Sequence, residues 1–169
     1  MFQYILGIPA HPLIVHFAVV LVVLLVAGAT VYALVPPLRR RIGWAVGLLA
    51  VVGPIAAWVA KESGQELQKL VQGQGYPAEF MAQVSQHSSF ADRTLYFSLG
   101  LAAAVLLLLL VSTAVGNRPA VEGETRRGSL LATIGLALAV LVLAAFTGYY
   151  IFKTGDTGAH MRWVDFEKK

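Results

Sequence analysis

The stretch LIVHFAVVLVVLLVAGATVYALV, residues 13–35, sets the class of this protein. Its polar interruptions are His16, Thr30 and Tyr32. A helix needs about 20 mostly apolar residues to cross the hydrocarbon core of a membrane. The stretch therefore predicts a membrane-spanning helix. It is too long for a cleavable signal peptide and lacks the basic flank of one.

Three more apolar stretches follow, at residues 42–60, 95–115 and 129–152. Over all 169 residues, 57% are hydrophobic and 13% are charged, whereas soluble domains carry about 25% charged residues. We predict an all-α integral membrane protein, a four-helix up-down bundle that forms one domain over residues 1–169. We find no internal repeat in the sequence. Because cysteine is absent, disulfides, thiolate metal sites and covalently attached haem are excluded.

Basic residues indicate the orientation of the bundle. The turn between the first two spans carries Arg39, Arg40 and Arg41, and the loop of residues 116–128 carries three further arginines. Because basic residues gather in short loops on the cytoplasmic side, we expect both loops inside. The two termini and residues 61–94 then lie on the outer side. The net charge of +4 follows from this bias and does not indicate nucleic acid.

The segment of residues 61–90 is polar enough to leave the membrane, yet it keeps apolar side chains at roughly helical spacing. We expect a short amphipathic outer segment of two helices, broken at residues 73–77 and lying over the mouth of the bundle. Its apolar stripe consists of Leu67, Leu70, Val71, Phe80, Met81 and Val84.

All four histidines fall on the outer side in this topology: His11, His16, His87 and His160. His16 is the most informative, because it lies among apolar residues within the first span. An ionisable residue there is costly, so we expect it to face the bundle interior and to have a function. The alternative is an inert imidazole that hydrogen-bonds to a helix carbonyl. His11 is five residues away, which is about 140° around a helix.

The candidate ligands suit two kinds of site. Imidazoles together with a carboxylate such as Asp156 suit zinc, copper or non-haem iron. Two imidazoles that face each other from different helices suit a six-coordinate haem b. The sequence contains no HExxH, Walker, GxGxxG or GxSxG motif. It therefore favours binding of a cofactor or a metal over catalysis.

Four segments together resemble one family. They are GIPAHPLIVHF at residues 7–17, KESGQEL at 61–67, His87 with Ala91 and Asp92, and GDTGA at 155–159 with Trp163. The chain is similar, over nearly its whole length, to a widespread bacterial family of four-helix membrane proteins of unknown function with an HP-x-x-VHF opening. The resemblance implies a bacterial inner membrane location, likeness to cytochrome b-type bundles, and haem or metal binding with electron transfer. The family's motif histidines fall on His11, His16 and His87.

We therefore expect a non-catalytic membrane subunit that binds one b-type haem and transfers electrons in a larger redox assembly. His16 and His87 are the expected axial ligands, and His11 and Asp156 the groups that orient them or pair with a haem propionate. Expected partners are membrane lipid and an outer c-type cytochrome or a quinol-linked protein. The alternatives are a single zinc, copper or iron ion held by His11, His16, His87 and Asp156, and a purely structural subunit. His160 is not an expected ligand.

Overall fold

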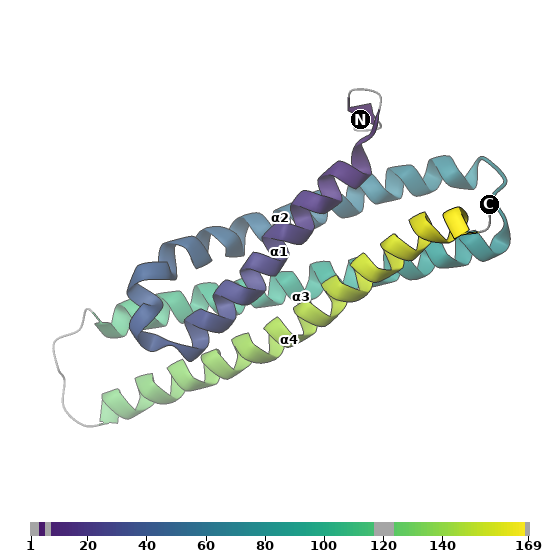
Figure 1. Ribbon diagram of the computed structural model, residues 1–169. Helices are drawn as coiled ribbons and strands as arrows, with labels where there is room; N and C mark the ends of the chain where they lie inside the picture. Colours follow the sequence, from purple (N-terminus) through teal and green to yellow (C-terminus); the bar gives the residue numbers. More distant parts are fainter. Residues whose placement is uncertain (1–3, 6–7, 117–123, 168–169) are drawn as a thin grey trace.

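Four long helices make up most of the protein. The computed structural model describes residues 4–5, 8–116 and 124–167. Its helices are α1 (Ala10–Leu34), α2 (Arg39–Gln72), α3 (Ala78–Gly116) and α4 (Glu124–Glu167). The other elements are a 3-10 turn, η1 (Pro36–Leu38), and a two-stranded antiparallel ribbon of β1 (Tyr4–Ile5) and β2 (Ile8–Pro9). Figure 1 shows the helices as an up-down four-helix bundle, which confirms the predicted fold class.

Each helix is long and apolar enough to cross a membrane. At 1.5 Å per residue, the 34 residues of α2 reach about 50 Å, beyond the hydrocarbon core of about 30 Å. The helices therefore extend past the membrane at one end or both. Residues 117–123 of the expected basic loop and the side chain of Trp163 lie outside what the structure describes.

The turn between α1 and α2 is closed by its first arginine. Arg39 Nε donates to the Tyr32 carbonyl at 2.9 Å, and Nη2 donates to the Ala33 carbonyl at 3.1 Å. These carbonyls belong to the last turns of α1, where a helix leaves such groups without partners. The arginine satisfies them and contributes a positive charge at the negative end of the helix dipole.

Residues 61–90 do not fold back over the bundle as expected. α2 runs on to Gln72, and α3 starts at Ala78 after a turn that contains Gly75 at φ +70°. The break lies where the sequence indicated it, but the two helices continue beyond the start of α1 as an antiparallel pair (Figure 1). Strong helix formers fill residues 65–72, so α2 has no reason to stop earlier. Of the apolar stripe, Leu70 is exposed and the other members are half-buried.

The arrangement of the helices fixes which of them face each other. α1 packs against α2 and α4, and α3 packs against the same two helices. α1 and α3 therefore lie diagonally across the bundle. The core in its middle is aliphatic and includes Leu25, Val46, Leu108 and Val140. Many large apolar side chains lie on the outside, as in a protein surrounded by lipid.

Candidate functional site

His11, near the start of α1, lies against α2. Its Nδ1 is 2.8 Å from Ser63 Oγ. The Ser63 hydroxyl donates its single hydrogen to the Ala60 carbonyl at 2.8 Å. The serine oxygen can therefore only accept from His11, so Nδ1 carries the hydrogen of the ring. In the neutral imidazole, Nε2 is then left with a free electron pair.

The ring of His11 rests on a glycine of α2. A Cβ added at Gly64 would lie 2.9 Å from His11 Cε1, closer than real Cβ atoms approach. Any side chain at this position would displace the imidazole. Ser63 and Gly64 thus fix the direction and the position of the ring together.

His87, in the first third of α3, is held in the same way by α4. Its Nδ1 is 3.1 Å from Thr157 Oγ1. The Thr157 hydroxyl donates to the Lys153 carbonyl at 2.8 Å, with the Thr154 carbonyl at 3.2 Å. The threonine oxygen accepts from the ring, so the hydrogen of His87 is also on Nδ1. A Cβ added at Gly158 would lie 3.1 Å from His87 Cε1.

The two histidine sites repeat each other residue by residue. In each, the imidazole meets a hydroxyl on the next helix and rests on the glycine that follows it. In each, the hydroxyl also donates to the carbonyl three residues earlier, of Ala60 in one site and Thr154 in the other. The two histidine sites are therefore local structural repeats, one in the hairpin α1–α2 and one in the hairpin α3–α4.

The repeat places the two imidazoles opposite each other. α1 and α3 lie diagonally in the bundle, and both rings lie at the end where α1 begins. Ligand sites in helix bundles are built in this way, from side chains on facing helices.

His16 does not face the bundle interior, which corrects the expectation. It is exposed on α1, and its Nδ1–H donates to the Pro12 carbonyl one turn earlier. The helix is continuous from Ala10, so His11 and His16 point about 140° apart. Because His11 packs against α2, His16 must point elsewhere. The structure therefore packs His11 and His87 each against a neighbouring helix and leaves His16 exposed.

Asp156 and His160 form a separate pair on α4. His160 Nδ1–H donates to the Asp156 carbonyl at 2.9 Å and lies 3.4 Å from Asp156 Oδ1. Within the described part of the chain, no group of three or more histidine or carboxylate side chains is placed to hold a metal ion. The alternative metal set, His11 and His87 with His16 and Asp156, is thus not assembled.

Beside the histidine pair, an ion pair joins α2 to α3. Lys61 Nζ lies 2.9 Å from Asp92 Oδ1, and the ammonium group is 5.9 Å from the centre of the Tyr96 ring. Sequence reasoning did not assign a role to Lys61, or to the hydroxyls and glycines that hold the rings. A serine or threonine followed by glycine, in KESG and in GDTG, was the signal available for them.

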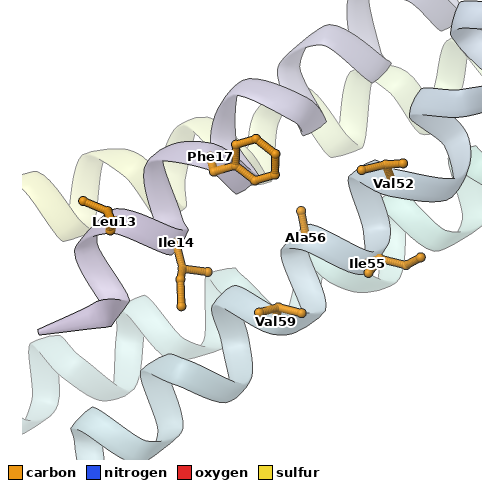
Figure 2. A pocket seen from close by; sticks show the side chains of 7 residues that line it. All are labelled: Leu13, Ile14, Phe17, Val52, Ile55, Ala56 and Val59. Carbon is orange, nitrogen blue, oxygen red and sulfur yellow. The ribbon is translucent and has the colours of Figure 1, made fainter. Parts of the chain in front are cut away.

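Two grooves open on the apolar surface. Figure 2 shows the first, of about 590 Å³ between α1 and α2. It is lined only by apolar side chains, among them Phe17 and Ile55. The second, of about 520 Å³, runs between α1 and α4, and Asp156 lines it together with apolar residues.

Comparison with known proteins places the chain in a family. No curated protein and no solved structure matches it. Residues 7–166 match the family described as "Predicted membrane protein (DUF2231)". The match spans all four helices and both histidine sites. The chain thus belongs to this family of predicted membrane proteins, whose function is unknown.

Proposed function

We propose that this membrane protein binds one b-type haem between His11 and His87 and transfers electrons as a subunit of a larger redox assembly. One observation carries the proposal. Two imidazoles on facing helices each have Nδ1–H held by a hydroxyl oxygen, which leaves Nε2 as the electron-pair donor. Histidine ligands of metals are usually held through their other ring nitrogen in this manner.

The number of donors favours haem over a bare ion. A porphyrin supplies four nitrogens to its iron, so the protein needs to supply only the two axial ligands. A structural zinc site needs four protein ligands and a catalytic one needs three. His11 and His87 would supply these two ligands. The axial pair proposed here is therefore His11 and His87, with His16 outside it.

The protein's own residues would prepare the site. Ser63 and Thr157 fix the tautomer of the two rings, and Gly64 and Gly158 provide the space in which the rings lie. Because these partners are fixed by continuous helices, the rings need little reorganisation when a ligand binds. When bound, the haem would supply the electron-carrying centre.

The location of the pair implies a partner. Both rings lie at one end of the bundle, opposite the arginine-rich start of α2. With those arginines on the cytoplasmic side, the pair faces the outer side of a bacterial inner membrane. A single centre at one surface does not carry electrons across the membrane. An outer c-type cytochrome or a quinol-linked protein would complete the route.

The test is the visible spectrum of the purified protein. In detergent, after reduction with dithionite, we expect the sharp α-band of a low-spin haem b with about one haem per chain. Metal analysis of the same sample serves as the control. Stoichiometric zinc or copper without an α-band would overturn the proposal in favour of a metal site. No metal and no α-band would overturn it in favour of a structural subunit.

A further inference from the structure

The repeat of the two hairpins extends past the histidine sites. Asp92 follows His87 by five residues, as His16 follows His11. Lys61 precedes Ser63 by two residues, and Gly155 precedes Thr157 by two. The Lys61–Asp92 ion pair between α2 and α3 therefore corresponds to Gly155 and His16 between α4 and α1.

At this position a groove lies in the interface between α4 and α1. Glycine has no side chain with which to bridge α4 and α1, and a Cβ added at Gly155 would meet no atom within 4 Å. The groove of about 520 Å³ lies here. Its walls include Val19, Val23 and Val26 of α1 and Phe152 of α4.

Hydrogen-bond acceptors stand at one end of this apolar groove. Asp156 lines it, and Asp156 Oδ1 lies 3.4 Å from His160 Nδ1. His16 precedes Val19 by three residues and Val23 by seven, so it lies on the same face of α1, one turn beyond the groove wall. The Nδ1–H of His16 is used by the Pro12 carbonyl, so the neutral ring presents Nε2 as an acceptor.

The groove and the histidine pair share one turn of α4. Gly158 contacts the ring of His87, whereas Gly155 and Asp156 line the groove. One helix, about 10 Å in diameter, therefore separates the two. A ligand in the groove would lie next to the site that binds haem under the proposed function.

We propose that the groove between α1 and α4 binds an amphiphile of the quinol class. Its hydroxyls would donate to Asp156 and His16, and its apolar tail would lie along Val19, Val23 and Val26. Acceptors at the groove end match hydroxyl donors, whereas the Asp156 carboxylate repels a phosphate headgroup. The volume lies within the range of about 300–1,000 Å³ of ligand pockets. The proposal rests on the proposed function only in linking this ligand to the haem.

The experiment measures binding of decylubiquinol to the detergent-purified protein by calorimetry, in samples without haem as well as with it. Gly155→Leu fills the groove without a clash, and we expect it to weaken binding at least tenfold. Gly135→Leu is the matched control, because Gly135 is on the same helix, outside the groove, and a Cβ there also meets no atom within 4 Å. It should bind like the parent. Asp156→Asn should weaken binding severalfold.

Parent-like binding by Gly155→Leu would overturn the proposal. So would displacement of decylubiquinol by an equal concentration of phosphatidylethanolamine, which would identify a lipid site. The two proposals fail separately. Quinol binding to a protein without an α-band contradicts the haem alone, and an α-band without quinol binding contradicts the groove alone.

Discussion

The two hairpins of this protein agree around their histidines and differ beside them. In each, a hydroxyl oxygen accepts a hydrogen bond from an imidazole, and a glycine lies against the same ring. Beside the first site, Lys61 and Asp92 join α2 to α3 with an ion pair. Beside the second, Gly155 and His16 leave a groove between α4 and α1.

The features that the two hairpins share and the feature that only one of them has serve different roles. Under the proposed function, the features that both halves share would orient two equivalent ligands toward one centre. The feature that only one half keeps is a contact that closes the bundle wall. The groove thus lies at the position in the second half that corresponds to the ion pair in the first half.

The largest effect is expected from removal of the imidazoles themselves. If His11 and His87 are equivalent ligands, His11→Ala and His87→Ala should each abolish the low-spin haem spectrum. His16→Ala is the matched control and should keep it, because His16 is exposed and bonds to its own helix. The spectrum of the reduced protein checks all three. Loss of the α-band in the His16 and His87 variants, with a normal band in the His11 variant, would restore the assignment made from the sequence.

The second largest effect is expected from substitution of the two glycines that lie against the rings. Gly64→Ala places a Cβ 2.9 Å from the ring of His11, and Gly158→Ala places one 3.1 Å from that of His87. Overpacking of this kind costs about 1–3 kcal/mol, so both variants should unfold at lower temperature, the first more so. Gly135→Ala is the control, since its Cβ meets no atom within 4 Å. Equal thermal midpoints for all three variants would show that the rings are not seated on these glycines.

The ion pair beside the first site should contribute a smaller amount to the free energy of unfolding. The Lys61 and Asp92 side chains are 20% and 39% exposed. Lys61→Met should therefore cost about 1 kcal/mol, between the values of exposed and buried pairs. Lys69→Met removes the more exposed Lys69–Glu66 pair of the same helix and should cost less. Chemical denaturation of the two variants gives the comparison, and the reverse order would contradict the assigned role of Lys61.

The smallest effect is expected from exchange of the two hydroxyl residues. The double variant Ser63→Thr with Thr157→Ser keeps both hydrogen bonds, so its stability should change by less than about 0.5 kcal/mol. Ser63→Ala removes the acceptor of His11 Nδ1–H and should cost about 1 kcal/mol. Urea unfolding distinguishes the two cases. A costly exchange would show that the hairpins are less alike than their hydrogen bonds indicate.

The parts of the site that were predictable follow from local properties. All four histidines could be assigned to one end of the bundle, because span number alone fixes the direction of each helix. The faces of α1 could not be predicted. Lipid and the core are both apolar, so a helix that is apolar all round carries no pattern that distinguishes its inner side. His16 was therefore placed inside, whereas the packing of α1 on α2 turns it outward.

The sequence by itself determined four membrane-spanning helices, their alternating directions and the turn before Ala78, because length, hydropathy and helix breakers act locally. Only the packing of the helices shows which histidines are held by a neighbouring helix, and that the two sites are alike. The contacts that hold the rings join residues 52 and 70 positions apart. Such contacts depend on the rotation and register of each packed helix. Apolar sequence leaves both undetermined until neighbouring helices interlock.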